Sequence, residues 1–284
     1  MPEKTPNALV NLGDLSEAAK TLIEKVSNAI VGIFEPWQIR RVAEAKADAA
    51  IITAKGEIQV TDLHRRAVRR WIDEEAQRQK NIEDITKQAI PHLTENADAS
   101  KINNDWITNF FDKSRIISDS EMQELWARLL AEESNKPGSY SKRTINILGD
   151  LDKNDAEIFT ALCGFCCVFE NVTTPLILNF DDNIYLYQNI TFDNLIHLES
   201  IGLVQFNPSG FTRKCLPKTI TVHHYEKSLY LFLPKDTDNE LYIGKALLTK
   251  TGQELSLICR SRPVIGFTDY LKNKWQVFSP TDLI

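Results

Sequence analysis

A long run without proline constrains the fold of this chain more than any other feature. From Trp37 to Ile90 the sequence holds a single glycine, Gly56, and is rich in alanine, glutamate and arginine, two of which are among the strongest helix formers. We expect one long helix, or two helices with a kink at Gly56. A helix of this length cannot bury its apolar side inside one small core. We therefore predict an arm that packs against other copies of the chain; a short hairpin within one chain is the simpler alternative.

A second apolar pattern precedes the arm. Its residues recur at spacings of four and three, the heptad pattern by which one helix packs along another. They are Leu15, Ala19, Leu22, Val26, Ala29 and Ile33. We predict that these six residues form an interface between the copies of a homo-oligomer. Contact of this helix with a membrane surface is the less favoured alternative, because its glutamates would be repelled by anionic lipid.

Several features of the chain favour a cytoplasmic location. No apolar run is long enough to cross a bilayer, and the first residues do not show the basic segment followed by an apolar one that marks a signal peptide. The five cysteines are odd in number and lack the spacing of a disulfide framework, which is typical of a reduced compartment. We therefore expect a cytoplasmic protein without a transmembrane segment.

A compact helical block is predicted after the polar segment from Ile90 to Asp105. Trp106 and Phe110 share one helical face, and Ser118 with Glu121 fits a capping box at the start of the next helix. Further helices are expected after Pro137-Gly138 and after Asp152, the last of them apolar on most sides and continuing to Phe169. The segment from Glu124 to Thr144 has an apolar helical pattern on each side of Pro137-Gly138. It is interpreted as the tight corner of this block.

Beyond Pro175 the elements become shorter and richer in strands. A short helix ends at Gly202, and the segment around Glu226 to Ser228 is predicted to join two strands in a hairpin. Helix, strand and wing-like hairpin together resemble a winged-helix module. The expected fold class is mainly α with a smaller α+β C-terminal part. Its three parts are an N-terminal amphipathic helix with the long helical arm (1–90), the compact helical block (103–170) and a winged-helix-like α+β module (171–284).

No motif in the chain supports an enzyme. Ser139 to Lys142 matches Ser-x-x-Lys, and Lys250 to Gly252 matches Lys-Thr-Gly, which together resemble part of the serine β-lactamase pattern. The Ser-Asp-Asn element between them is missing, and both matches are short enough to arise by chance. Phosphate-binding, dinucleotide-binding and zinc-protease motifs are also absent. We expect a non-enzymatic protein without a cofactor.

The cysteines are not expected to bind metal. Cys163, Cys166 and Cys167 lie close together in the sequence, but a structural zinc site needs four ligands, usually in two close pairs. Cys215 and Cys259 are isolated, and phenylalanines flank the cysteine group on both sides. Buried thiols in an apolar helix are the preferred interpretation.

Two groups of basic residues could bind phosphate, since guanidinium groups fit phosphate oxygens well. The first, on the long arm, is Arg65, Arg66, Arg69 and Arg70, and the second, in the C-terminal part, is Arg213, Lys214, Lys218, Arg260 and Arg262. A solvated helix face paired with nearby carboxylates is the alternative for the first group. The net charge of −6 argues against a dedicated nucleic-acid protein, and the expected recognition helix carries Asp193 and Glu199, which would repel phosphate.

The segment Leu125-Trp126-Ala127-Arg128 through Pro137-Gly138-Ser139 to Thr144, together with "EPWQIRRVAEAKADAA" and "LTKTGQEL", resembles an uncharacterised bacterial family, domain-of-unknown-function family 2806. The likeness extends from about Leu9 to the C-terminus. It implies a bacterial cytoplasmic setting, and it assigns no activity, cofactor or catalytic residue.

Our leading hypothesis is therefore a non-enzymatic, oligomeric helical protein whose winged-helix-like module recognises an unknown protein partner. One alternative is a nucleic-acid-binding protein that uses the basic face of the long helix and the wing. Another is a bacterial defence effector, against phage for instance, that acts on a membrane or on a partner in the cell.

Overall fold

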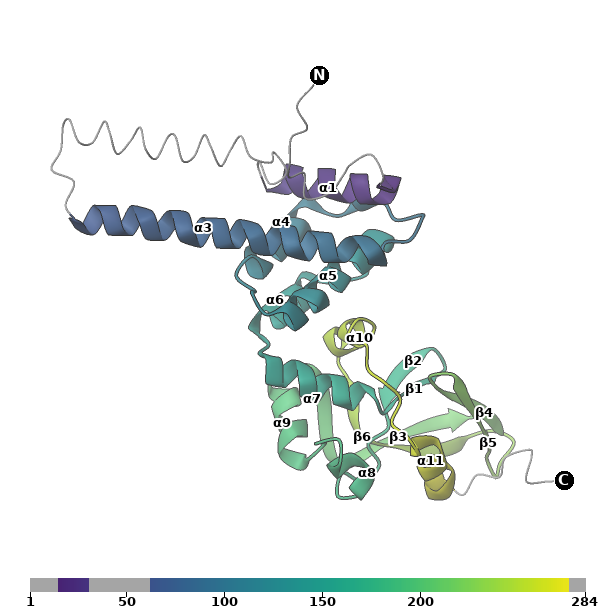
Figure 1. Cartoon of the computed structure of the whole chain (residues 1–284). Helices are drawn as coiled ribbons and strands as arrows, with labels where there is room; N and C mark the ends of the chain where they lie inside the picture. Colours follow the sequence, from purple (N-terminus) through teal and green to yellow (C-terminus); the bar gives the residue numbers. More distant parts are fainter. Residues whose placement is uncertain (1–14, 31–61, 276–284) are drawn as a thin grey trace. The chain divides into compact units, whose positions relative to one another are not determined.

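The computed structural model of the protein describes residues 15–30 and 62–275. The chain divides into two compact units, residues 1–149 and 150–284, whose helices and strands Figure 1 labels. Within the described ranges every strand belongs to the second unit, and the first unit is helical. The prediction of a mainly α chain with strands in its C-terminal part is thus confirmed.

The first unit is built from helices that form one core. Its elements are α1 (Glu17–Ala29), α3 (Asp62–Ala89), the 3₁₀ helices η2 (Ile90–His92) and η3 (Ala99–Lys101), α4 (Asn104–Ser114), α5 (Ser120–Asn135) and α6 (Lys142–Asp150). Helix α3 packs against α4 and α5. At the centre, the edge of the Trp126 ring meets Phe110 with 5.1 Å between ring centroids, and Phe110 stacks on Trp106 at 5.3 Å. The predicted aromatic face therefore forms the core of this unit.

Capping residues fix where these helices begin. Asn103 caps α4 through hydrogen bonds from the backbone N–H groups of Asp105 and Trp106. Helix α5 is capped by Asp119, which accepts from the N–H groups of Glu121 and Met122, and not by Ser118 as the capping-box pattern predicted. The pattern was misplaced by one residue because serine and aspartate are both strong N-caps and stand side by side here.

The second unit combines helices with two sheets. Its elements are α7 (Lys153–Cys163), β1 (Cys166–Phe169), β2 (Val172–Pro175), α8 (Asn183–Leu186), α9 (Phe192–Ser200), β3 (Val204–Leu216), β4 (Thr219–His224), β5 (Lys227–Phe232), β6 (Asn239–Leu248), α10 (Lys250–Ser256) and α11 (Phe267–Trp275). One sheet has the strand order β2-β1-β4-β5, and the other pairs β3 with β6. All of these pairs are antiparallel.

The predicted hairpin around Glu226 is confirmed. Strands β4 and β5 pair from Thr219 opposite Phe232 to His224 opposite Lys227, so Tyr225 and Glu226 form the turn. The short helix α9 ends at Ser200, two residues before the predicted Gly202, whose φ of 81° is a conformation that glycine adopts without strain.

The prediction of a helix continuing to Phe169 is wrong. Helix α7 ends at Cys163, and the next four residues after a short connection form β1. Glu170 and Asn171, with φ of 48° and 65°, make the tight turn to β2, and β1 also pairs with β4. The apolar run was ambiguous because buried helices and buried strands both lack alternation. As a consequence, residues 150–170 of the expected helical block belong to the second unit.

Candidate interaction surfaces

The first half of α3 is exposed on all sides. Every residue from Asp62 to Trp71 is exposed, whereas Ile82 and Ala89 near the end of the helix are buried. Figure 1 shows the beginning of α3 extending beyond α4 and α5, the helices against which it packs. The described part of the predicted arm is thus a helix that is anchored at one end only; the rest of the arm, residues 37–61, lies outside the described residues.

An apolar stripe runs along this exposed half. Leu63, Ala67 and Trp71 follow one another at intervals of one turn, and we call them the apolar stripe of α3. Trp71 and Ile82 are eleven residues apart, which is about three helical turns, so they lie on the same side of α3, with the ion-paired Glu74, Glu75 and Arg78 between them on that side. Leu63 is 64% exposed and Trp71 is 62% exposed. Exposed apolar side chains that follow one another at successive turns are a feature of interaction sites.

Four arginines in the exposed half of α3 lie on the sides of the helix turned away from Trp71, since each residue turns the helix by about 100°. They are Arg65, Arg66, Arg69 and Arg70. Arg66 pairs with Asp62 at 3.6 Å, and Arg70 pairs with Glu74 at 3.3 Å. Among the described residues no carboxylate forms an ion pair with Arg65 or Arg69. Two of the four arginines of the predicted basic face therefore form ion pairs with carboxylates of the same helix.

The basic residues predicted for the wing are largely paired with carboxylates. The pairs are Arg213 with Glu170 at 3.1 Å, Lys214 with Glu240 at 3.1 Å and Lys218 with Asp236 at 2.8 Å. Arg213 also lies over the ring of Phe169, 4.9 Å from its centroid. Arg260 and Arg262 are exposed on the connection between α10 and α11. The structure does not gather these five residues into a strongly basic patch on β3.

Helix α9, the expected recognition helix, exposes apolar and acidic side chains. Phe192 is 42% exposed and Ile196 is 43% exposed, one turn apart on the same side, and Asp193 and Glu199 are exposed as well. His197 is hydrogen-bonded to Asp155 of α7 at 2.5 Å. A surface with this composition suits contact with a protein better than contact with phosphate.

The residues predicted as an oligomer interface on α1 are used within the chain. Ala19, Leu22 and Val26 have no exposed surface, because α1 packs against η3 and α4. The ammonium group of Lys25 fixes this packing by donating to the side chain of Asn104 at 2.7 Å. Leu15 and Ala29 are partly exposed at the edges, and Ile33 lies outside the described residues. In the single chain the heptad pattern therefore marks an internal contact, which corrects its assignment to a contact between copies.

A buried carboxylate organises the turn between α5 and α6. Glu133 is 1% exposed and accepts hydrogen bonds from the backbone N–H of Gly138 at 2.6 Å and of Tyr140 at 3.0 Å. The hydroxyl of Ser139 donates to the backbone carbonyl of Lys136 at 2.7 Å, and Lys142 pairs with Asp105 at 3.4 Å. The Ser-x-x-Lys match thus lies on a turn in which serine and lysine have separate structural partners.

Three cysteines that are scattered in the sequence meet in the second unit. The thiol of Cys163 is buried and lies near the thiols of Cys166 and Cys259, both of which are partly exposed. The expectation that Cys259 is isolated is therefore wrong, since the spacing in the sequence does not reveal that it lies near the other two. In the described part of the chain no group of three or more histidine, cysteine, aspartate or glutamate side chains is arranged to hold a metal ion.

Comparison with known proteins places the chain in a family. A family model described as "Protein of unknown function (DUF2806)" matches residues 65–272, more than half of the chain. The chain belongs to the DUF2806 family. No curated protein and no solved structure matches it. The DUF2806 match begins within α3, so α1 precedes it, while α5, α9 and the three clustered cysteines lie inside it.

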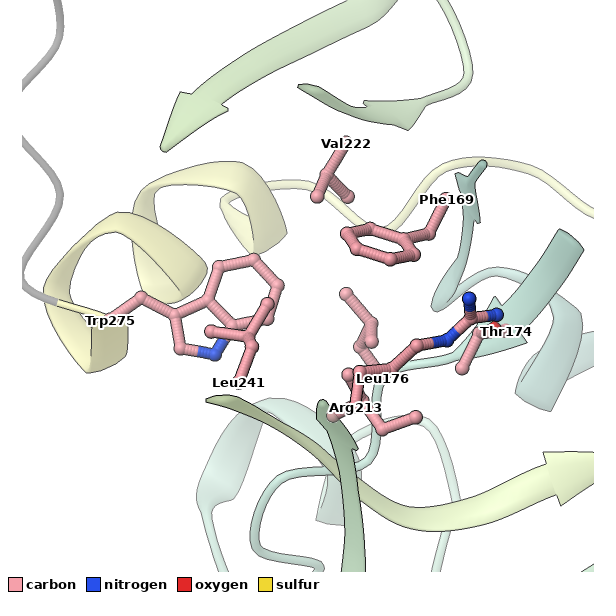
Figure 2. A pocket seen from close by; sticks show the side chains of 8 residues that line it. Phe169, Thr174, Leu176, Arg213, Val222, Leu241 and Trp275 are labelled. Atoms are coloured by element: carbon pink, nitrogen blue, oxygen red, sulfur yellow. The ribbon is translucent and has the colours of Figure 1, made fainter. Parts of the chain in front are cut away.

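The best-defined cavity of the DUF2806 protein is too small for an organic ligand. It measures about 10 Å³, about the space of one water molecule. Figure 2 shows Phe169 and Val222 of the four-stranded sheet around it, together with Leu176, which follows β2, and Trp275 of α11 beside Leu241 of β6. It is a packing gap in an apolar core.

We also compared the described helices with the length and apolar character of a membrane-spanning helix. Within residues 15–30 and 62–275, the DUF2806 protein has no helix that combines the length and apolar character needed to cross a bilayer.

Proposed function

We propose that this DUF2806 protein is a non-enzymatic helical protein that assembles through the exposed half of α3 and recognises a protein partner through its C-terminal unit. The observation that carries the proposal is the apolar stripe of α3. Its large side chains are exposed along one side of the helix, so a second helix laid along it would cover both Leu63 and Trp71.

The energetics favour a second copy as the occupant of the stripe. Burying apolar surface stabilises a complex by about 25 cal/mol per Å², and tryptophan is among the residues that dominate interfaces when a partner covers it. Two copies of α3 paired along their stripes would cover both exposed tryptophans at once. The arginines and carboxylates on the other sides of the helix would stay in water.

The C-terminal unit supports partner recognition by its element order. Helix α7, helix α9 and the antiparallel pair β3–β6 come in the order of a winged-helix module, with β1, β2 and α8 between the two helices and the β4–β5 hairpin between the two wing strands. The outer side of α9 offers Phe192 and Ile196 beside Asp193 and Glu199. We propose that this side of α9 contacts a protein.

Light scattering coupled to size-exclusion chromatography tests the assembly. We expect the wild-type chain to elute as a dimer or larger species relative to its mass of 32.4 kDa, and Trp71→Glu to elute as a folded monomer. Tyr187→Glu is the matched control, since Tyr187 is an exposed aromatic of the second unit and its replacement should leave the assembly intact. Because assembly depends on protomer concentration, a wild-type chain that stays monomeric across a concentration series would contradict the proposal.

Nucleic-acid binding is a second candidate, favoured by one observation. Arg65 and Arg69 lie one turn apart on α3, exposed and without a carboxylate partner among the described residues. If they bind phosphate, affinity for mixed-sequence DNA or RNA should fall steeply with salt and should be lost in the double variant Arg65→Ala, Arg69→Ala. The double variant Arg66→Ala, Arg70→Ala, at the paired positions, should retain more of it. Fluorescence anisotropy with no change at 50 mM salt (about the lower end of the range in which such contacts are strong) would rule this candidate out.

A further inference from the structure

The strongest unassigned feature of the molecule is the group of three thiols in the second unit. Cys163 is the last residue of α7, Cys166 is the first residue of β1, and Cys259 follows α10. The buried thiol of Cys163 lies between the two partly exposed thiols. We call these three residues the thiol cluster.

A close approach of two backbone segments creates the cluster. A Cβ atom at Gly164 would lie 2.8 Å from the carbonyl oxygen of Arg262, so only glycine lets the segment after α10 pass here. The N–H of Val264 donates to the carbonyl of Gly164 at 3.3 Å. The neighbouring Phe165 is fully buried against Tyr185 and Phe267. These contacts hold the segment of Cys259 against the end of α7.

The surroundings of Cys259 favour its thiolate. The S–H of Cys163 and the backbone and side chain of Ser261 stabilise the anion, and together they lower the pKa of the Cys259 thiol to about 7 against the opposing effect of burial. The hydroxyl of Ser261 is itself hydrogen-bonded to that of Tyr225 at 2.6 Å. Burial raises the pKa of the Cys163 thiol well above its ordinary value. The partly exposed thiol is thus the more readily ionised one, and its neutral neighbour is buried beside it.

We propose that the thiol cluster is a site of oxidative modification by peroxides, in which Cys259 reacts first and Cys163 then forms a disulfide with it. The sulfur of the Cys259 thiolate attacks one peroxide oxygen, the O–O bond breaks, and for hydrogen peroxide the leaving hydroxide takes up a proton to become water. The resulting sulfenic acid is attacked by the sulfur of Cys163, which loses its proton. The S–S bond forms and a second water leaves.

Hydrogen peroxide is the only oxidant that this reaction requires. Two thiols lose two electrons and two protons, and one hydrogen peroxide molecule is reduced to two water molecules. The disulfide requires the Cβ atoms of Cys163 and Cys259 to come about 3.8 Å apart, and the segments that carry them are held together by the contacts of Gly164 with Arg262 and Val264. Cys215 provides the contrast, since it is exposed on β3 and belongs to no cluster.

Mass spectrometry of the full-length reduced chain tests the proposal. After treatment with a small excess of hydrogen peroxide and alkylation of the remaining thiols, we expect two fewer alkylated cysteines, a peptide pair linked through Cys163 and Cys259, and full reversal by dithiothreitol. Cys163→Ser should stop at the Cys259 sulfenic acid, which dimedone traps. The control Cys215→Ser should form the disulfide as the wild type does.

A second measurement does not depend on replacing a clustered cysteine. Ser261→Ala keeps all five thiols, and we expect it to slow the alkylation of Cys259 by iodoacetamide at pH 7 by about threefold or more, because a thiolate loses one hydrogen-bond donor. Alkylation of Cys215 should be unchanged. A wild-type linkage between Cys163 and Cys166, oxidation confined to Cys215, or irreversible oxidation of Cys259 without a disulfide would each overturn the proposal.

Discussion

Single side chains decide how the turns and strand ends of this molecule are held. The side-chain carboxylate of Glu133 accepts hydrogen bonds from two backbone N–H groups in the turn that follows α5. The indole N–H of Trp106 donates to the carbonyl of Tyr140 in the same turn at 2.8 Å. His224 plays a similar part in the second unit, where its buried ring bonds to the carbonyl of Gly164 at 3.0 Å. Each of these groups is polar, buried and satisfied, so its replacement should be costly.

Replacing the buried carboxylate by an amide should destabilise the first unit. In Glu133→Gln one of the two backbone donors faces an NH₂ group instead of an oxygen, and we expect the free energy of unfolding to fall by about 2 kcal/mol. Urea denaturation measures the change. The neighbouring exposed residue gives the control, and Glu132→Gln should change stability by less than about 0.5 kcal/mol. Equal effects of the two variants would show that Glu133 does not hold the turn.

The buried histidine should make stability depend on pH. Burial lowers the pKa of His224 below its ordinary value of 6.5, and the nearby Lys227 adds to this effect. The unfolded chain therefore binds a proton more readily than the folded one, so this contribution to stability is present above about pH 6.5 and is lost as the pH falls below it. In His224→Gln, which keeps a donor for Gly164, the decline in melting temperature between pH 7 and pH 5 should become shallower.

The adjacent histidine supplies the control for that titration. His223 is exposed and bonds to the hydroxyl of Ser228 at 2.8 Å, so His223→Gln should retain the wild-type pH profile. If the profile of His224→Gln matched that of the wild type, protonation of His224 would not be the cause of the decline.

At the scale of the elements, helix α1 is the clearest test of how an apolar pattern is used. Its fully buried Leu22 packs inside the first unit. Leu22→Ala should therefore lower the free energy of unfolding by about 2–5 kcal/mol and leave the mass in solution unchanged. Leu15→Ala, at the partly exposed edge, should cost less. Dissociation of an oligomer by Leu22→Ala without loss of stability would restore the original assignment of this helix to a contact between copies.

Much of the element order could be predicted from the sequence, and the failures have local causes. Turn and cap residues such as Gly202 and Asp152 predicted the end of α9 and the start of α7 to within two residues, since their conformational preferences act over one or two residues. The apolar run to Phe169 could not distinguish helix from strand. The thiol cluster could not be predicted from the sequence, because the proximity of residues 163 and 259 depends on the tertiary fold and leaves no spacing pattern.

At the scale of the whole molecule, the two units each have a core of their own. The first is centred on Trp126 and Phe110, and the second on Phe165, Tyr185 and Phe267. Because domains with separate cores often unfold separately, we expect the calorimetric enthalpy of unfolding to exceed the van't Hoff enthalpy.

Matched core variants make that expectation specific. Phe267→Ala should lower one component of the thermal transition, and Leu22→Ala should lower the other, each by several degrees. The measurement is differential scanning calorimetry of the full-length chain. A single transition that both variants shift equally would show that the two units unfold as one.

The exposed half of α3 determines how far from their cores two assembled copies would meet. A helix rises about 1.5 Å per residue, so Trp71 stands about 16 Å along the axis from Ile82, where the helix enters its core. Copies joined at Trp71 would therefore meet about 16 Å from the point where each α3 enters the core of its own first unit. The contact between copies would then be made by α3, and the packing of α3 against α4 and α5 within each copy would be unchanged.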